Sequence, residues 1–185
     1  HHLQIARAQE LAGLPPLRRF SGFTAYSEGW GLYSESLGEE MGFYRDPYAK
    51  YGQLSMEMLR AARLVVDSGM HSQGWSRDRT IKYLMDNAGL TEGFAVAETD
   101  RYILRSGQAL AYKIGELKIK SLRAKAKAAL REDFDLRRFH NAVLDNGPLP
   151  LNILEQQIDR WVDGEKRRLP KTQQVQIDKR KPAVL

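Results

Sequence analysis

The sequence contains no cysteine in its 185 residues. Disulfide bonds and thiolate metal sites are therefore excluded, because both need the cysteine sulfur atom. Any metal would have to be bound by histidine and carboxylate side chains, a donor set that favours zinc or a similar ion. The lack of cysteine leaves the cellular compartment open, since it is compatible with oxidising and reducing surroundings alike.

Long hydrophobic runs are missing as well. No stretch approaches the roughly 18 consecutive apolar residues that a membrane-spanning helix needs, so we predict no membrane span in this portion. The sequence begins with histidine and shows no signal-peptide pattern of a basic start, an apolar run and a small-residue cleavage site. We therefore expect it to be the C-terminal portion of a longer protein.

Aromatic residues are few where the charge is most positive. The net charge is +6, and much of the basic excess lies in residues 113–131 and 166–181. Lysine and arginine alternate there with alanine and leucine, as on a solvated helix face, and no interleaved aromatics are present to stack on bases. We predict no nucleic-acid binding, although a basic helical protein that binds other acidic partners stays a minor alternative.

The hydrophobic pattern predicts an all-α protein with about eight helices, because strand-type alternation is absent throughout. Residues 1–164 should form one helical domain, and residues 165–185 a basic tail. A basic connector is expected over Leu17–Gly22, and a turn over Met70–Trp75 that carries His71. The expected helices are Leu3–Gly13, Phe23–Gly42, Pro47–Ser68, Ser76–Gly89, Thr91–Leu104, Gln108–Leu130, Asp135–Val143 and Pro150–Gly164.

Glu28 is the most unusual charge in the sequence. Up to about Tyr33 its helix is apolar nearly all round, so the carboxylate needs a cation, a hydrogen-bond network or a proton. One hypothesis is a metal ion shared with His1 or His2, since two antiparallel helices could bring the three side chains together. The alternative is an expression-tag remnant at His1 and His2 and a salt-bridged core glutamate at Glu28.

Other polar residues could contact a substrate. Tyr112 shares a helical face with Gln108, and a tyrosine hydroxyl or a histidine such as His71 can donate to the oxyanion of a tetrahedral intermediate. The alternatives are a packed core tyrosine and a loop histidine. Arg101, which follows Asp100, could bind a substrate carboxylate through two hydrogen bonds, or belong to a structural salt bridge.

Four blocks together resemble a known family. They are residues 1–4, 23–33, 107–115 and 139–144, beginning with His-His-Leu-Gln, Phe-Thr-Ala-Tyr, Gly-Gln-Ala-Leu and Phe-His-Asn-Ala. The sequence is similar to the bacterial domain of unknown function 885, which is often found in predicted secreted or lipid-anchored proteins. That family is related to the glutamate-type zinc metallopeptidases, or gluzincins.

The resemblance implies a zinc site. The family carries the motif His-Glu-x-x-Pro-Gly-His, and this chain would begin at the histidine after Pro-Gly. By that match His1 fits a zinc-ligand position better than His2, Glu28 is the third ligand, and Tyr112 and His71 resemble substrate or transition-state contacts. Ser106 departs from the family, which commonly has proline there.

The resemblance also implies a function. This chain would form one wall of a gluzincin-like cleft in a Zn²⁺-dependent peptidase, in which metal-bound water hydrolyses a peptide amide. The missing N-terminal portion would supply the other wall and the catalytic His-Glu pair, so these residues alone should not complete the site. A catalytically inactive binding or structural module is the alternative. The implied location is periplasmic or secreted, with or without a lipid anchor, and a cytoplasmic one is left open.

Overall fold

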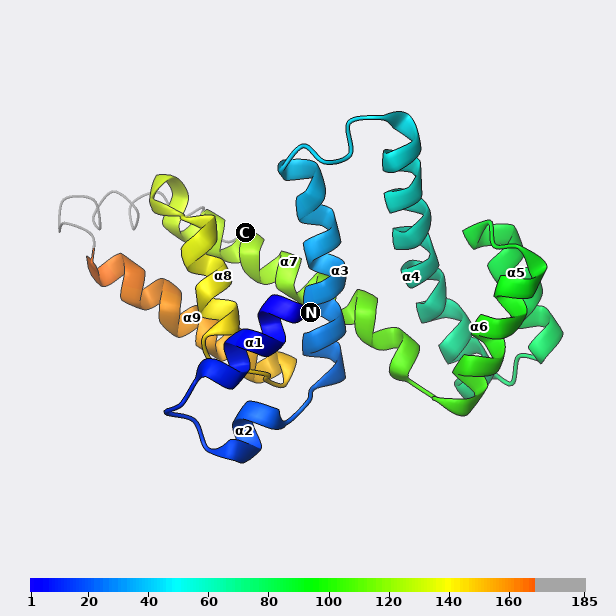
Figure 1. Ribbon diagram of the computed structural model, residues 1–185, viewed down its shortest axis with the longest axis horizontal. Coiled ribbons are helices and arrows are strands. Elements are labelled where there is room, and N and C mark those ends of the chain that lie inside the picture. The colour runs from blue at the N-terminus through cyan, green and yellow to red at the C-terminus, as the bar shows by residue number, and fades with distance from the viewer. Residues whose placement is uncertain (169–185) are drawn as a thin grey trace, which may run out of the picture. The chain divides into compact units, whose positions relative to one another are not determined.

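The computed structural model describes residues 1–168 (Figure 1). Regular structure in this range is entirely helical, with nine α-helices and two short 3-10 helices, so the predicted all-α class is confirmed. The chain forms two compact units. Of the described residues, the first unit contains 1–23 and 118–168, and the second contains 24–117.

The first unit is built on α1, α8 and α9. Helix α1 packs against α2 and α8, and α8 packs against α9. The Nε atom of Arg7 in α1 donates to Asp145 at 2.8 Å, and Arg18 in α2 donates to two carbonyl oxygens of the α8–α9 turn, each at 2.9 Å. The helices of this unit are α1 (His2–Glu10), α2 (Pro16–Phe20), the later part of α7 (Ala111–Leu130), η2 (Arg131–Asp133), α8 (Leu136–Leu144) and α9 (Leu151–Arg168).

The second unit surrounds the middle of α4. Helix α4 packs against α3, α5, α6 and η1, and α5 packs against α6. Its helices are α3 (Thr24–Glu40), α4 (Pro47–Gln73), α5 (Arg77–Ala88), α6 (Glu92–Leu104), η1 (Gln108–Leu110) and the first turns of α7. The buried apolar core consists of Leu59, Ala62, Val66, Leu84, Ala88, Ala95, Tyr102 and Ala109.

The prediction for the end of α4 is wrong. The helix was expected to end at Ser68, just before Gly69, but it continues to Gln73, so His71 lies in its last turn and not in a loop. Gly69 instead makes room for an aromatic ring, since a Cβ atom there would lie 2.8 Å from Cε3 of Trp75. Gly74 ends the helix with φ +65°, a conformation that favours glycine.

Three smaller expectations also need correction. Most of the expected connector at Leu17–Gly22 lies in α2, which Pro16 opens at a position where proline loses no helical hydrogen bond. The expected helix from Gln108 begins as 3-10 helix η1 before α7 starts. Helix α9 continues to Arg168, so the first residues of the expected tail are helical, while residues 169–185 lie outside the described part of the chain.

Helices α3 and α7 cross at a pair of glycines within the second unit. A Cβ atom on Gly29 would lie 2.9 Å from the backbone nitrogen of Glu116, and one on Gly115 would lie 2.6 Å from Cα of Gly29. The Gly115 Cβ would also overlap the carbonyl oxygen of Ala25. The two backbones are therefore in direct contact, which only residues without a side chain allow at this separation.

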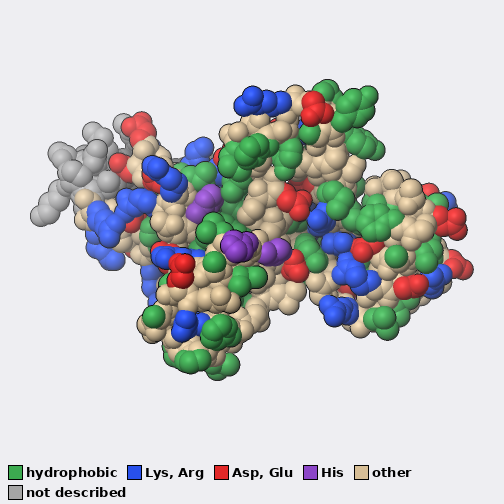
Figure 2. All heavy atoms as spheres, in the orientation of Figure 1, with side chains coloured by type: hydrophobic (Ala, Val, Ile, Leu, Met, Phe, Trp, Pro, Cys, Tyr) green, Lys and Arg blue, Asp and Glu red, His purple; other side chains and the backbone are tan. Residues whose placement is uncertain are grey.

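The first half of α4 exposes an apolar surface, and Figure 2 shows hydrophobic side chains gathered over it and over the loop before it. The exposed large apolar residues of this half-helix and of the loop before it are Met41, Phe43, Tyr48, Tyr51, Leu54, Met56 and Met58. None of the helices in residues 1–168 combines the length and the apolar character that crossing a membrane requires.

The glycine crossing can be tested by stability. Gly115→Ala should lower the free energy of unfolding by about 1–3 kcal/mol, because the added methyl group forces two backbones apart. Gly52→Ala, in α4, is the matched control, since a Cβ there meets nothing within 4 Å. It should raise the free energy of unfolding by about 0.5–1 kcal/mol. Urea denaturation followed by circular dichroism measures both, and equal midpoints would contradict the close crossing.

Candidate functional site

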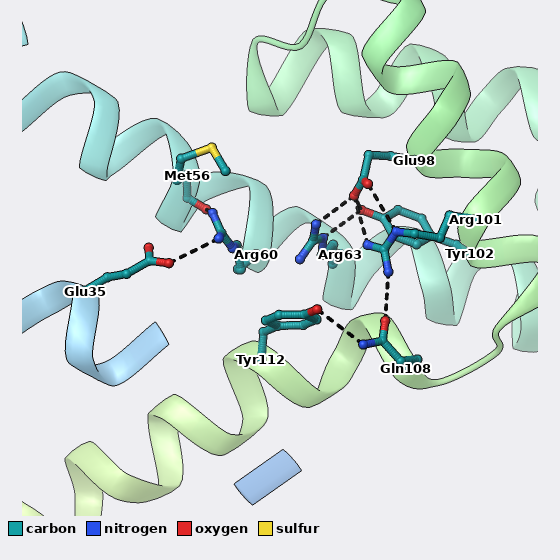
Figure 3. Close-up of polar contacts among 9 residues, drawn as sticks. All are labelled: Glu35, Met56, Arg60, Arg63, Glu98, Arg101, Tyr102, Gln108 and Tyr112. Carbon is teal, nitrogen blue, oxygen red and sulfur yellow. Dashed lines mark hydrogen bonds and ion pairs between the residues drawn. The ribbon is translucent and has the colours of Figure 1, made fainter. Parts of the chain in front are cut away.

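Arg63 is the centre of a buried polar network in the second unit (Figure 3). Its Nε atom donates to the Tyr102 hydroxyl at 2.7 Å, and its Nη2 atom lies 2.7 Å from Oε2 of Glu98. The Tyr102 hydroxyl donates to the same carboxylate. Because Arg63 is only 7% exposed, these contacts replace the water that its guanidinium group has lost.

A second arginine, Arg101, contacts the same carboxylate. Its Nε and Nη2 atoms lie 3.1 and 3.0 Å from the two oxygens of Glu98. Its Nη1 atom donates to Oε1 of Gln108 at 2.8 Å, and Nε2 of Gln108 donates to the Tyr112 hydroxyl at 3.3 Å. A continuous set of hydrogen bonds therefore joins Arg101, Gln108 and Tyr112, three of the predicted site residues (Figure 3).

The network holds Glu98 in its ionised form. Burial raises the pKa of the Glu98 carboxyl group, but hydrogen bonds from Arg101, Tyr102 and Arg63 outweigh burial and lower that pKa from 4.5 to about 2. Burial, together with the nearby carboxylate, raises the pKa of Tyr102 to about 12. At neutral pH the two guanidinium groups therefore carry two positive charges around one negative charge.

Helical spacing accounts for the arrangement. In α6, Glu98 precedes Arg101 by three residues and Tyr102 by four, which places the three side chains on one face of the helix. Arg63 lies within the buried stripe of α4 that faces α6. The network therefore forms where the core-facing sides of two packed helices each carry charge.

Asp67 and His71, one helical turn apart in α4, bind the last turn of α6 and the turn that follows it. Both carboxylate oxygens of Asp67 lie 3.1 Å from the backbone nitrogen of Gly107, whose φ is +80°. The Nε2 atom of His71 lies 3.0 Å from the carbonyl oxygen of Tyr102. Helix α4 thus anchors the turn between α6 and η1. This turn separates Arg101 from its hydrogen-bonded partners Gln108 and Tyr112.

The predicted metal ligand Glu28 lies beside the glycine crossing. Glu28 directly precedes Gly29 in α3, while Tyr112 lies three residues before Gly115 in α7. Because the two glycines are in backbone contact, the helix segments that carry Glu28 and Tyr112 pack against each other within one unit.

The other two predicted ligands belong to the first unit. His1 directly precedes α1 and His2 is its first residue, whereas Glu28 belongs to the second unit, so the proposed ligand set stays a prediction. No group of three or more His, Asp or Glu side chains within residues 1–168 is arranged to hold a metal ion. The imidazole and carboxylate groups themselves are of the type that zinc binds.

Asp100 belongs to a different interaction from Arg101. Its two carboxylate oxygens accept hydrogen bonds from Arg77 in α5, at 2.7 and 3.0 Å, and both side chains are about half exposed. Asp100 therefore forms a surface ion pair with Arg77, while Arg101 forms a salt bridge with Glu98, as one of its two interpretations expected.

Sequence reasoning missed three residues of this region, namely Arg63, Asp67 and Glu98. A signal for two of them was present, because Arg63 and Asp67 flank buried positions of an amphipathic helix, where a charge needs a partner. Glu98 had a weaker signal in its spacing to Arg101. The same argument that singled out Glu28 would have found the two α4 residues.

Residues 1–158 match the family described as bacterial protein of unknown function (DUF885). No curated protein matches the chain. The fold is similar to that of a provisionally named lipoprotein from Colwellia psychrerythraea, with 47% sequence identity and a TM-score of 0.87. That match covers 89% of this chain and 28% of the other.

A second solved structure is a provisionally named lipoprotein of unknown function from Shewanella oneidensis, with 25% identity and a TM-score of 0.78. The match covers 84% of this chain and 28% of that one. The chain therefore corresponds to well under half the length of both proteins.

The Glu98 network predicts a pH-dependent stability. The fall in the pKa of Glu98 from 4.5 to about 2 corresponds to about 3 kcal/mol of stability when the group is ionised. Because the folded-state pKa is the lower one, this stability is complete above pH 4.5 and is lost as the pH falls toward 2. The difference in unfolding free energy between wild type and Glu98→Gln should therefore shrink across that range in urea titrations.

Asp100→Asn is the matched control for this experiment, because it removes an arginine-paired carboxylate from the same helix at an exposed position. Its effect on stability should be much smaller at neutral pH, since exposed ion pairs contribute little. A difference between wild type and Glu98→Gln that stays constant from pH 7 to pH 2 would contradict the assignment of an ionised, network-bound Glu98.

Proposed function

Because the chain belongs to the family of bacterial proteins of unknown function (DUF885), we propose that it is the C-terminal part of a zinc-dependent peptidase. The observation that best supports this proposal is the glycine crossing, which packs the segment of the expected ligand Glu28 against that of the expected substrate contact Tyr112. Glu28 and Tyr112, which only the family resemblance assigned to one site, thus lie on helices whose backbones are in contact.

The metal would be held by Glu28 and by His1 or His2, with the remaining groups coming from outside this chain. A histidine and carboxylate donor set suits zinc, and a bound zinc ion would supply an activated water and polarise an amide carbonyl. By the family motif His1 is the better candidate of the two histidines. Glu28 would contribute negative charge, which helps to keep a divalent cation in place.

The polar network would bind the substrate. Tyr112 accepts a hydrogen bond from Gln108 and keeps its own hydroxyl proton as a donor for a developing oxyanion. Arg101 and Gln108 would position the peptide, and Arg101 is accessible, with 32% of its side chain exposed. His71 uses Nε2 at the Tyr102 carbonyl, so any substrate contact would come through its Nδ1 atom.

The proposed location is the cell envelope. Two proteins with this fold carry the provisional name lipoprotein, and both are longer than this chain. A periplasmic or secreted peptidase, held by a lipid anchor in some members, is consistent with those names. The partners of this chain would then be a peptide substrate and an N-terminal portion of the same protein that completes the active-site cleft.

Metal analysis of the full-length protein tests the proposal. Wild type should contain about one zinc ion per chain, and Glu28→Ala should lose both the zinc and the peptidase activity while keeping its helical circular dichroism. Glu39→Ala is the matched control, because it removes an exposed carboxylate from the same helix and should change neither quantity. His1→Ala should lower the zinc content more than His2→Ala.

Two results would overturn parts of the proposal. Zinc retained in Glu28→Ala would remove Glu28 from the ligand set. A full-length protein that contains no zinc and does not take it up would contradict the peptidase assignment, and would favour the alternative of a catalytically inactive helical binding or structural module.

A further inference from the structure

The Arg63–Glu98–Arg101 group has more positive than negative charge. Both guanidinium groups contact the single carboxylate of Glu98, whose pKa of about 2 keeps it ionised. Tyr102, Gln108 and Tyr112, the other members of the network, are uncharged side chains. The hydrogen-bonded group itself thus has one excess positive charge, which favours a ligand with one negative charge. The buried carboxylate of Asp67, one helical turn from Arg63 in α4, lies outside this group and binds the backbone nitrogen of Gly107.

Hydrogen-bond donors in the network are left over. A guanidinium group has five N–H donors. Arg63 uses Nε and one proton of Nη2 in its bonds to Tyr102 and Glu98. This leaves the other proton of Nη2 and both protons of Nη1, the nitrogen without a dashed contact in Figure 3. Arg101 uses Nε, Nη2 and one proton of Nη1, which leaves one N–H on each terminal nitrogen.

Aromatic rings hold both guanidinium groups in fixed orientations. The Cζ atom of Arg63 lies 4.8 Å from the ring centre of Tyr112, and that of Arg101 lies 4.7 Å from the ring centre of Tyr102. Such stacking reduces the rotamer freedom that an arginine would otherwise lose on binding a ligand. The remaining N–H donors are therefore already oriented before a ligand binds. Arg63 also lies directly against Tyr112, the predicted transition-state contact.

We propose that Arg63, Arg101 and Tyr112 form a carboxylate-binding site, and that the substrates are peptides with a free carboxylate next to the reacting amide. That the ligand is a peptide rests on the proposed function. That the site binds a carboxylate rests on the contacts of the two arginines and does not depend on peptidase activity. A single excess charge and the planar fork of Arg101 match a carboxylate better than a phosphate dianion. The carboxylate could be the C-terminus or an acidic side chain.

Binding to zinc-free, full-length protein tests the site without contribution from a metal. Three probes distinguish a C-terminal carboxylate from a side-chain carboxylate. They are N-acetyl trialanine with a free carboxylate, the same peptide with a C-terminal amide, and the amidated peptide with glutamate as its last residue. Isothermal titration calorimetry should show at least about tenfold tighter binding for one carboxylate-bearing probe than for the neutral amide, since a hydrogen bond to a charged group is lost in the amide.

Two variants connect this preference with the network. Arg101→Gln should remove the tenfold preference, whereas Arg105→Gln, an exposed arginine just beyond α6, should keep it. Arg63→Lys retains the charge but loses the fork geometry, so it should reduce the preference only in part. Circular dichroism of each variant shows whether the fold is intact, and a folded Arg101→Gln protein that keeps the full preference would overturn the proposal.

The outcomes separate this inference from the proposed peptidase activity. Equal binding of all three probes by a zinc-loaded protein that hydrolyses peptides would overturn the carboxylate site and leave the peptidase proposal standing. Carboxylate-selective binding that depends on Arg101, in a protein that neither holds zinc nor hydrolyses peptides, would support the site and contradict the peptidase proposal.

Discussion

Backbone contact between α3 and α7 is the constraint on which the candidate site depends. At Gly29 and Gly115 the helices approach so closely that a single Cβ atom would overlap the opposite backbone. The contact fixes the first turns of α7, and with them Tyr112, relative to the helix that carries Glu28. Because main-chain atoms make it, the position of these turns does not depend on the rotamer of any side chain.

The charge network also depends on the position of α7, because its hydrogen bonds end at Tyr112 in that helix. Arg63 on α4 is held by Glu98 on α6, and Gln108 and Tyr112 continue the hydrogen bonds into η1 and α7. Asp67 fixes the turn between α6 and η1 through the backbone of Gly107. A displacement of α7 at the glycine crossing would therefore alter the donors that surround Tyr112.

Local signals in the sequence were sufficient to predict most of the helices. They were insufficient to predict which side chains meet in the candidate site. The helices expected from Ser76 and from Asp135 begin where the structure has them, because each of these side chains accepts a hydrogen bond from a backbone nitrogen only three residues away. Gly69 was misread because its role depends on the ring of Trp75, and Arg63 was missed because its partner lies 35 residues further along the chain. Pairing with His1 stays a prediction, since the ligands belong to separate units.

A purely structural role would leave the composition of the network unexplained. A buried ion pair contributes to stability only when good geometry and further hydrogen bonds offset the desolvation of both ions, which costs several kcal/mol per ion. Here two guanidinium groups contact one carboxylate, and the second, Arg101, remains one-third exposed with N–H donors to spare. The exposed donors of Arg101 are not needed for its pairing with Glu98, so an anion that approaches from solvent could use them without breaking the buried part of the network.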